Sequence, residues 1–489
     1  MVEKDQLLAY IYAKLTYAPH LARELTQIKE TRQPFRHRNV YFKLKEYVDT
    51  FLARETPGSS ENRIVVLPGL RGLGKTTLLL QLYDYLTQEK RIDQERVLYL
   101  PTDELKAYLG KDILETITVF VEDVFKTSLV NLDKQLFIFI DEVHFDKSWD
   151  VAAKIVYDQT KNVFLILTGS SALSIEMSVD LVRRSQRKSV FPLSFGEYLL
   201  LKYNIRLPFN VAENIRALIL DPSKAAADSA GDLWGKVKRA MLPIGTPLEK
   251  EFEYFMSSGG FPFSIYLDEK STYERIYSMI ERVVAKDVFE LQSFNTETRH
   301  LITRIIYYIA SQTPGGTSDI KLANSLHTSP TLIRSILEVL EKTHLIFSIK
   351  PLGGAGKSVR KSWKYYFLSP SINAAIRSEL GICASGDRKT LGLFAENLVA
   401  AYLFRLKETT HELTGLFYDP DKGGADFLIL RGVEKVLPVE VGIGEKGEDQ
   451  VKSSMKRYHS EYGVVLSRTG NISMDRSILH VPITFFSFA

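Results

Sequence analysis

Cysteine is almost absent from this sequence, and long apolar runs are absent altogether. Cys383 is the single cysteine among 489 residues, which excludes disulfide bonds within the chain and any zinc site built from several cysteines, and which fits a reducing cytoplasm. No apolar run reaches the roughly 20 residues that a membrane-spanning helix needs. The first residues carry charges among their apolar positions, unlike the core of a secretory signal. We therefore expect a soluble, cytoplasmic protein with no membrane partner.

An excess of either charge is also missing. The chain has 63 Lys and Arg against 59 Asp and Glu, so its formal net charge is only +4. This balance excludes binding to nucleic acid through overall charge, and any basic surface has to be local. Apolar residues make up 45% and charged residues 25%, which is ordinary for a folded protein, and the length suggests about three domains.

A glycine-rich turn lies between an apolar strand and an apolar-periodic helix in "RIVVLPGLRGLGKTTLLLQLYDYL". The pattern Gly69-x4-Gly74-Lys75-Thr76 fits the phosphate loop, in the strand-to-helix context that this motif requires. In such a loop the backbone N–H groups close on phosphate oxygens, the lysine reaches the β- and γ-phosphates, and the hydroxyl holds Mg²⁺. The sequence thus predicts a site for ATP and Mg²⁺ whose nucleotide-binding residues are Gly69, Leu70, Arg71, Gly72, Leu73, Gly74, Lys75, Thr76 and Thr77.

Two carboxylates follow the apolar run Leu136–Ile140 in "QLFIFIDEVHF". Such a run is typical of a strand buried on both faces of a parallel sheet. Asp141, at the end of this strand, is the expected Mg²⁺ ligand, directly or through water. Glu142 is the expected catalytic residue that polarises the attacking water. We interpret the neighbouring His144 as a structural loop residue rather than a catalytic one.

A second apolar run, Val163–Leu167, ends in hydroxyl side chains. Thr168 and Ser170 are candidates for sensing the γ-phosphate by hydrogen bond. The alternative is a simple turn at the end of the strand.

Three arginines precede the next short strand in "DLVRRSQRKSVFPLSFGEYL". Arg183, Arg184 and Arg187 are candidates for an arginine finger that completes the nucleotide site of a neighbouring subunit and stabilises charge on the transferring phosphoryl group. The alternatives are a solvated turn or a contact to the DNA backbone.

The segment "SDIKLANSLHTSPTLIRSILEVLEKTHLIFSIKPLGGAGKSVRKSWKYYFLSP" predicts a helix-turn-helix followed by a two-stranded wing. Ile320–Leu326 is the first helix, while Ser329 caps the second helix and Pro330 takes its first position. Basic side chains on a wing can bind DNA phosphates with little sequence specificity, and the candidates are Lys357, Arg360, Lys361 and Lys364. The alternative is a packing module that does not contact DNA.

The C-terminal part has the element order of the PD-(D/E)xK endonuclease-like fold. "LGLFAENLVAAYLFRL" predicts a helix, "GADFLIL" and "VLPVEVGI" predict strands, and "GEDQVKSSMKRYHSEYG" and "GVVLS" predict a further helix and strand. Asp426 and Glu440 on the two strands form a candidate second Mg²⁺ site, with Glu396 on the helix as a third carboxylate.

The lysine that such nucleases carry two places after their last acid is missing, because Gly442 stands there. Lys446 or Lys452 can substitute for it, and Gln450 with Tyr458 resembles the helix dyad of some nuclease branches. The missing lysine favours a domain that keeps the fold for dimerisation or DNA docking over one that cleaves.

Five short stretches occur in a characteristic order: "GLRGLGKTTLL", "IFIDEVHFDKSWDVAAKIVYD", "ILTGSSAL", "DLVRRSQRKSVFPLSFGEYL" and "GGFPFSI". Together they resemble the archaeal and bacterial AAA-type ATPases that carry a C-terminal domain of uncharacterised function. The resemblance covers roughly Arg36 to the C-terminus. It implies an α/β fold, with an αβα P-loop ATPase core, a helical lid, a winged helix and a small restriction-endonuclease-like domain. It also places Arg184 at the family's arginine before the "PLSF" strand.

The expected domains follow from these motifs: an N-terminal helical segment, the ATPase core, the lid, the winged helix and the nuclease-like domain, at 1–60, 61–200, 201–300, 301–370 and 385–489. The small-residue stretch "DPSKAAADSAGD" within the lid predicts a loop or weak linker. In related ATPases the segment before the first core strand packs over the adenine. Arg38 or Tyr41 is therefore a candidate for that contact, and an amphipathic helix that only packs on the core is the alternative.

The predicted function is Mg²⁺-dependent ATP hydrolysis by a homo-oligomer that acts on DNA, mainly through its backbone. One alternative is a nucleotide-gated switch that acts through protein partners without nucleic acid. The other alternative is an ATP-regulated nuclease.

Overall fold

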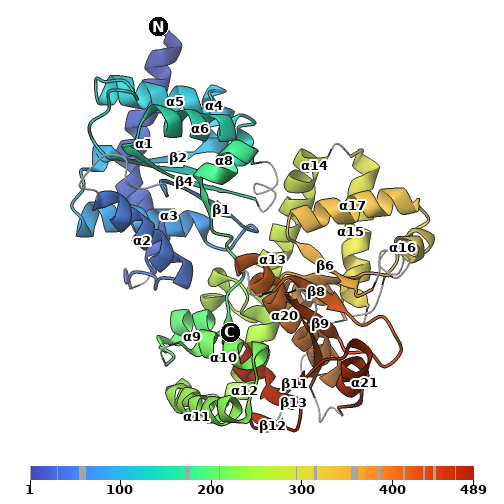
Figure 1. Cartoon of the computed structure of the whole chain (residues 1–489). Helices are drawn as coiled ribbons and strands as arrows, with labels where there is room; N and C mark the ends of the chain where they lie inside the picture. The colour runs from blue at the N-terminus through green and yellow to red at the C-terminus, as the bar shows by residue number, and fades with distance from the viewer. Residues whose placement is uncertain are drawn as a thin grey trace. The chain divides into compact units, whose positions relative to one another are not determined.

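The computed structural model of this chain describes residues 2–29, 31–53, 62–170, 177–208, 210–292, 294–312, 317–353, 362–382, 387–410, 413–432, 435–443, 448–468 and 470–489. Its contacts divide the chain into two compact parts, the N-terminal unit Met1–Val190 and the C-terminal unit Phe191–Ala489 (Figure 1). None of the helices within the described ranges has both the length and the apolar character that crossing a membrane requires.

The N-terminal unit contains a five-stranded sheet in which every pair of neighbouring strands is parallel. The strand order is β2-β3-β4-β1-β5, with bounds Val97–Pro101, Leu136–Asp141, Val163–Gly169, Ile64–Pro68 and Gln186–Arg187. The first four of these strands are buried along their whole length, as the continuous apolar runs predict. Since the strands are parallel, the residues that follow β1, β3 and β4 meet at one edge of the sheet.

Helices cover both faces of this sheet, as parallel strands require. They are α1 (Val2–Thr26), α2 (Asn39–Leu52), α3 (Lys75–Asp84), α4 (Thr102–Leu109), α5 (Ile113–Val119), α6 (Trp149–Gln159) and α8 (Val179–Arg184). In Figure 1, α2 and α3 lie on one side of the sheet and α5 and α6 on the other.

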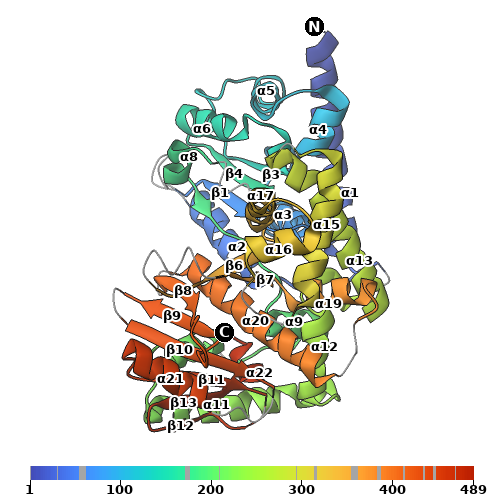
Figure 2. The same cartoon turned by 90° about the vertical axis from the view of Figure 1, so that its right-hand side faces the viewer.

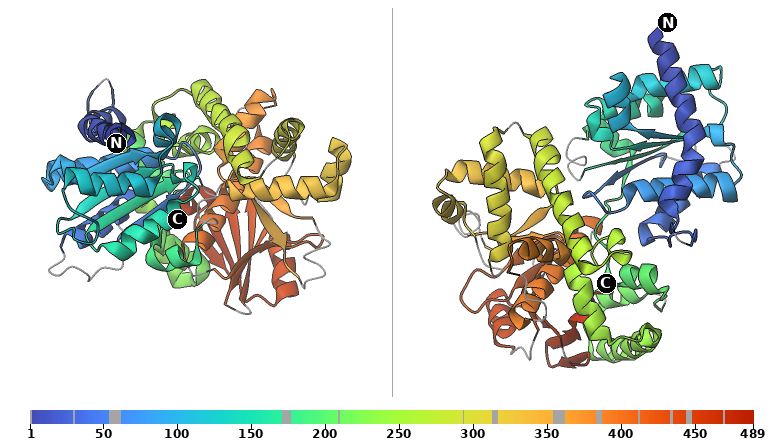
Figure 3. Two further views of the ribbon diagram at one scale, coloured as in Figure 1. Left: turned by 90° about the horizontal axis from the view of Figure 1, so that it is seen from above. Right: turned by 180° about the vertical axis from the view of Figure 1, so that it is seen from behind.

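Alternate side chains of each strand pack into two separate cores. Ile64 and Val66 of β1 face a cluster that includes α1, α4, α5 and α6. On the opposite face, the ring of Phe51 from α2 lies 5.4 Å from that of Phe137 and 5.3 Å from that of Phe164. Helix α1, the long dark-blue helix at the N-terminus in Figure 3, packs against α3 and the edge strand β2. The predicted α/β fold class is confirmed.

The C-terminal unit begins with helices. They are α9 (Phe195–Tyr203), α10 (Val211–Leu220), α11 (Lys224–Met241), α12 (Leu248–Ser258), α13 (Glu269–Arg282), α14 (Val288–Leu291), α15 (Thr296–Ser311), α16 (Asp319–Leu326) and α17 (Pro330–Lys342). The helices α19 (Pro370–Glu379), α20 (Arg388–Thr409), α21 (Asp449–Tyr458) and α22 (Ile483–Phe486) follow.

The stretch expected as a loop or linker, "DPSKAAADSAGD", is helical, and that prediction was wrong. Helix α11 begins at Lys224, and the Ser223 side chain accepts a hydrogen bond from the backbone N–H of Ala226. Alanine has the highest intrinsic helix propensity, so a serine cap followed by alanines starts a helix rather than a linker.

Eight strands of the C-terminal unit form one mixed sheet with the order β12-β13-β11-β10-β9-β8-β6-β7. In chain order, β6 to β13 are Ile346–Pro351, Lys364–Phe367, Gly415–Tyr418, Phe427–Arg431, Lys435–Gly442, Gly463–Ser467, Ser473–Asp475 and Ile478–Pro482. The antiparallel hairpin β6–β7 joins the rest through a parallel pairing in which Lys350 lies opposite Phe417 (Figure 2). The strands expected for the wing and those expected for the C-terminal domain therefore belong to one sheet.

Candidate nucleotide-binding site

The glycine-rich loop connects the end of β1 at Pro68 to the start of α3 at Lys75. Gly74, which precedes α3, has φ 83°, in the left-handed region that glycine adopts at little cost. A Cβ atom on Gly69 would lie 2.7 Å from the carbonyl oxygen of Val190, so only glycine fits there. The side chains of Leu70 and Leu73 are buried. The loop backbone is therefore fixed at both ends, with its apolar side chains packed inside the unit.

The side chain of Lys75 lies along this loop. Its ammonium group donates to the carbonyl oxygens of Gly69 at 2.8 Å and Leu70 at 3.2 Å, and the side chain is buried. The cation is thus held beside the backbone segment that the motif assigns to phosphate binding.

Asp141, at the end of β3, accepts hydrogen bonds from three hydroxyl groups. The Thr76 hydroxyl donates to it at 2.6 Å and the Tyr99 hydroxyl at 3.0 Å, and the Thr168 hydroxyl donates to its other oxygen. These donors come from α3, β2 and β4, so the network joins three elements to β3. Burial and the neighbouring negative charge of Glu142 raise the pKa of the Asp141 carboxyl. The hydrogen bonds from Thr168 and Thr76 lower this pKa but do not cancel the rise.

The oxygen atoms around Asp141 suit a magnesium ion. Mg²⁺ prefers hard oxygen ligands and usually takes only one or two from the protein, the rest coming from phosphates and water. Thr76 and Asp141 offer a hydroxyl and a carboxylate whose oxygens are 2.6 Å apart. Among the residues that the structure describes, no group of three or more His, Cys, Asp and Glu side chains is arranged to hold a metal. The residues present therefore fit an ion that arrives with a nucleotide rather than a closed protein site.

Glu142 has a strained backbone. Its φ of 52° is uncommon for a residue with a side chain, and such strain is often found at functional sites. Its N–H donates to the Thr168 hydroxyl at 3.2 Å, so Thr168 connects the two predicted acids. The Glu142 carboxylate lies 3.4 Å from Nδ1 of His144. Ser170, the other hydroxyl candidate, is buried just beyond the end of β4.

The three candidate arginines lie at and just after α8. Arg184 ends this helix, and its guanidinium group donates to Asp158 at 3.1 Å and to the backbone oxygen of Asp180 at 3.0 Å. Arg183 is exposed, and Arg187 is an exposed residue of β5. Arg184 is thus held by acidic residues of α6 and α8, and its role as a finger stays a prediction.

The two candidates for an adenine contact are both largely buried. Arg38 donates to the carbonyl oxygen of Leu73 at 2.9 Å, which ties the start of α2 to the phosphate loop. The Tyr41 ring stacks on His37, with centroids 3.8 Å apart. Tyr41 lies on the same buried face of α2 as Leu44. The arrangement suits the alternative of a packing helix, with Arg38 supporting the loop.

The residues predicted to bind DNA fall into two groups. Lys357, Arg360 and Lys361 lie outside the described residues. Lys364 is the first residue of β7, its side chain is 12% exposed, and its ammonium group lies 3.6 Å from the Glu396 carboxylate. The structure thus places Lys364 beside an acidic residue of its own unit.

The second helix of the predicted winged helix, α17, makes several polar contacts within the C-terminal unit. The Ser335 hydroxyl accepts a hydrogen bond from Gln292 at 2.7 Å. Arg334 pairs with Asp319 at 2.8 Å. Both side chains are therefore bonded to residues of their own unit.

The structure brings Asp426 and Glu440 together. Glu440 on β10 is fully buried and accepts the backbone N–H of Asp426 at 3.2 Å. The Asp426 carboxylate in turn accepts the N–H of Val441 at 2.9 Å. The third carboxylate, Glu396 on α20, accepts the hydroxyl of Tyr366 at 2.7 Å. Burial raises the pKa of the Tyr366 hydroxyl well above its usual range, and the nearby charges of Glu396 and Asp426 add to this.

Two lysines were candidates to replace the missing nuclease lysine, and Gln450 with Tyr458 formed the candidate helix dyad. Lys446 is outside the described residues, and Lys452 pairs with Glu448 at 2.6 Å. Gln450 donates to the backbone oxygen of Gly424 at 3.2 Å, and Tyr458 donates to Asp419 at 3.2 Å.

The roles of two residues in these hydrogen-bond networks are not predicted from the sequence. Tyr99 sits in the apolar run "RVLYLP" and reads as an ordinary core residue, although its hydroxyl reaches Asp141. Asp419 is buried and accepts hydrogen bonds from Ser454 at 2.6 Å and from Arg457 and Tyr458, which fixes α21 to the loop before β9. No local signal marks either role, because their partners are far away in the sequence.

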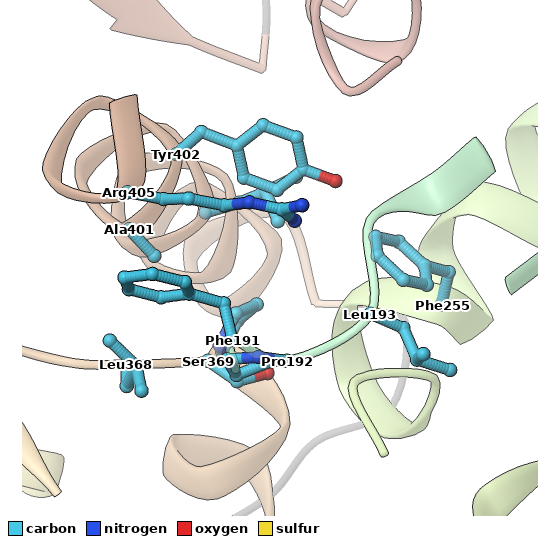
Figure 4. Close-up of a pocket in the computed structure, with 11 residues that line it drawn as sticks. Phe191, Pro192, Leu193, Phe255, Leu368, Ser369, Ala401, Tyr402 and Arg405 are labelled. Carbon is cyan, nitrogen blue, oxygen red and sulfur yellow. The ribbon is translucent and has the colours of Figure 1, made fainter. Parts of the chain in front are cut away.

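A pocket of the C-terminal unit, drawn in Figure 4, does not form a second ligand site. Phe191 and Phe255 contribute to its apolar lining, and Tyr402 and Arg405 of α20 contribute its polar groups. Its free volume is about 20 Å³, which is enough for roughly one water molecule. The Tyr402 hydroxyl already accepts the backbone N–H of Phe195 at 2.8 Å.

Residues 61–199 match the family described as "AAA domain", and residues 249–407 match a domain of unknown function, DUF8612. The first match contains the phosphate loop, Asp141 and Glu142. The predicted AAA-type core is therefore confirmed.

The chain is similar along most of its length to proteins from two microorganisms. It is 34% identical to the uncharacterized protein MJ1637 of Methanocaldococcus jannaschii, over 90% of this chain and 86% of that protein. It is 25% identical to an uncharacterized protein of Haemophilus influenzae, over 62% of this chain and 66% of that protein. Among solved structures, the Aeropyrum pernix ORC2 protein in complexes with ADPNP and ADP is 12% identical, over 73% of this chain and 96% of that one, with a TM-score of 0.34.

Proposed function

Since this chain belongs to the same protein family as MJ1637 of Methanocaldococcus jannaschii and contains an AAA domain, we propose that it is a Mg²⁺-dependent ATP hydrolase. The observation that carries the proposal is the hydrogen-bond network around Asp141, which joins Thr76 at the start of α3 to Thr168 and, through it, to Glu142. A Mg²⁺ ligand and a group that activates water are then neighbours at the end of the phosphate loop.

Each residue of the site has a separate task in this proposal. The backbone N–H groups of residues 69–74 and the ammonium group of Lys75 bind the phosphates. Thr76 and Asp141 hold Mg²⁺, which neutralises charge on the β- and γ-phosphates when bound. Glu142 orients the attacking water and accepts its proton.

The hydroxyls at the end of β4 complete the proposal. Thr168 bonds to Asp141 and to the backbone N–H of Glu142. Thr168 and Ser170 are the proposed sensors of the γ-phosphate.

We propose further that the protein acts as a homo-oligomer in which Arg184 reaches the site of a neighbouring subunit. Its side chain is 28% exposed, and its guanidinium group would have to leave Asp158 and Asp180 to do so. Loss of an arginine finger lowers turnover by about 10³-fold or more. Loss of a surface ion pair lowers folding stability by only about 1 kcal/mol or less and should leave turnover nearly unchanged. Turnover by Arg184→Ala distinguishes these cases, with Arg183→Ala as the matched control on the same helix.

The C-terminal unit is proposed to act on DNA through the predicted winged helix, with Lys357, Arg360 and Lys361 as backbone contacts. The basic segment between β6 and β7 supports this, because clustered lysine and arginine bind phosphates without reading sequence. The predicted nuclease-like domain, with Asp426 and Glu440, is proposed as a docking or dimerisation module. Gly442 in place of the lysine and the backbone hydrogen bonds made by both carboxylates support this reading over cleavage.

One observation favours the alternative of a nucleotide-gated switch that acts through protein partners. Ser335 and Arg334 of α17, the helix that would enter a DNA groove, are already bonded to Gln292 and Asp319. A helix whose polar side chains are bonded to residues of its own unit is better suited to packing against protein than to contacting DNA bases.

One experiment distinguishes these functions. ATP turnover is measured at low salt with and without duplex or branched DNA, for the wild type, Lys75→Ala and Glu142→Gln. The proposal predicts turnover in the wild type at a rate that changes with DNA, turnover at least about 100 times slower in Glu142→Gln, and none in Lys75→Ala. Turnover without any DNA binding or DNA effect would support the protein switch, and Mg²⁺-dependent cleavage that is lost in Asp426→Ala would support the nuclease.

A further inference from the structure

His144 lies beside the residue proposed to activate water. It belongs to the short 3-10 turn Val143–Phe145 that follows Glu142. Its ring is almost buried, with 6% of the side chain exposed, and Nδ1 lies 3.4 Å from a carboxylate oxygen of Glu142. The contact meets the distance of an ion pair but not the geometry of a hydrogen bond, and a proton on Nδ1 is attracted to the carboxylate.

The turn that carries His144 is itself fixed. The side chain of Asp146 accepts the backbone N–H of Ile113 at 2.8 Å and that of Ser148 at 3.1 Å. The rings of His144 and Phe145 lie 4.6 Å apart between centroids. The imidazole is therefore a rigid group and not a freely rotating side chain, which makes it a suitable fixed point for a neighbour.

Glu142 needs such a fixed point. Its backbone is held in the left-handed region by the hydrogen bond to Thr168, but its carboxylate is at the end of three rotatable bonds and its side chain is 20% exposed. A general base has to lie within hydrogen-bond reach of the water it activates, and a displacement of about 1 Å can cost up to about 100-fold in rate.

We infer that His144 is a positioning residue that holds the Glu142 carboxylate in the orientation needed for water activation. This inference rests on the proposed ATP hydrolysis and goes beyond our interpretation of His144 as a structural loop residue. His144 acts through Glu142 on the hydrolytic step, and it takes no part in binding the nucleotide.

Three substitutions separate this role from simple packing. His144→Asn keeps an N–H donor close to the position of Nδ1, since the side-chain amide nitrogen of asparagine lies at the same number of bonds from the backbone. His144→Gln moves the donor one bond further out. His144→Phe keeps the ring and its packing volume but has no donor.

We expect His144→Phe to lower kcat by about 10-fold or more, while the Kd for ATP, measured with a fluorescent analogue, stays within about 2-fold of the wild type. His144→Asn restores most of the lost kcat, and His144→Gln restores less. In the Glu142→Gln background, His144→Phe causes no further loss, because both changes act on one group. Melting temperatures of all variants identify any that do not fold.

Equal kcat in the wild type and His144→Phe would overturn the inference, as would equal losses in His144→Phe and His144→Asn, or a parallel loss of ATP binding. If His144→Phe does not fold, kcat is compared between His144→Asn and His144→Gln. A higher kcat in His144→Asn supports the inference, and equal kcat in the two variants would overturn it. A wild type that binds but does not hydrolyse ATP would overturn the proposed function itself. A wild type whose turnover depends on Glu142 but not on His144 would overturn only this inference.

Discussion

The Thr76 hydroxyl donates to the Asp141 carboxylate across 2.6 Å, and this hydrogen bond ties the first turn of α3 to the end of β3. This hydrogen bond holds the phosphate loop and the acidic strand together. Such preorganisation lowers the reorganisation needed at the moment of reaction.

Removal of the Tyr99 hydroxyl is expected to weaken the use of Mg²⁺ more than the binding of ATP. Tyr99 donates to the same oxygen of Asp141 as Thr76 does, so Tyr99→Phe leaves the carboxylate less firmly oriented. Second partners of a metal ligand typically contribute about 10-fold or more to metal affinity or activity. We expect the Mg²⁺ concentration for half-maximal turnover to rise by about that factor, as measured by titration at saturating ATP.

Tyr83→Phe is the matched control. Tyr83 is buried in α3, and its hydroxyl makes no hydrogen bond within the described structure. Its removal should leave the Mg²⁺ dependence unchanged. Equal effects of the two substitutions would mean that Tyr99 contributes only packing.

Asp141→Asn is expected to stabilise the protein without nucleotide while abolishing turnover. Burial and the charge of Glu142 raise the folded-state pKa of Asp141 above its ordinary value of 3.8. The folded state then binds more protons than the unfolded state above that pH, so the wild type loses stability as the pH rises from about 4 through the folded-state pKa. Asparagine does not ionise and avoids this loss.

The measurement is the melting temperature of both proteins at a series of pH values in the presence of a chelator. We expect the difference in melting temperature between Asp141→Asn and the wild type to be smallest near pH 4 and to grow with pH. Each kcal/mol of difference in the free energy of unfolding corresponds to about 2–4 °C in a unit of this size. ATP and Mg²⁺ together should reverse the order, because a bound cation stabilises the ionised carboxylate. A difference that stays constant with pH would contradict this account.

Asp426→Ala is expected to destabilise the C-terminal unit. The substitution removes the acceptor for the backbone N–H of Val441, which is buried. An unsatisfied buried N–H costs about 1–3 kcal/mol in the free energy of unfolding, as measured by denaturant titration. Asp426→Asn keeps one carbonyl oxygen and should cost less. Identical free energies of unfolding for Asp426→Ala and the wild type would show that this hydrogen bond does not stabilise the unit.

The sequence predicts the strand, turn and helix that carry the phosphate-loop motif because their signals are local. The strand, the glycine turn and Lys75 lie within one continuous stretch, and Asp141 directly follows an apolar run that is typical of a buried strand. Parallel pairing of β1, β3 and β4 then forces these residues to the same edge of the sheet.

Features that depend on distant partners could not be predicted. Lys364 reads as one more basic residue of a wing, and only the fold shows that its ammonium group lies beside Glu396. The pairing of Lys350 with Phe417, which joins the two predicted C-terminal domains into one sheet, has no local signal. The residues of "DPSKAAADSAGD" were misread because aspartate, proline and serine mark turns as often as they begin helices.

The most direct test of the central claim is the release of phosphate from ATP by the wild type, Lys75→Ala and Glu142→Gln, with ATP binding measured on the same preparations. The account predicts that the wild type hydrolyses ATP only with Mg²⁺. Glu142→Gln should bind ATP but turn over at least about 100 times more slowly, and Lys75→Ala should lose binding. Phosphate release by Glu142→Gln at the rate of the wild type would contradict the account.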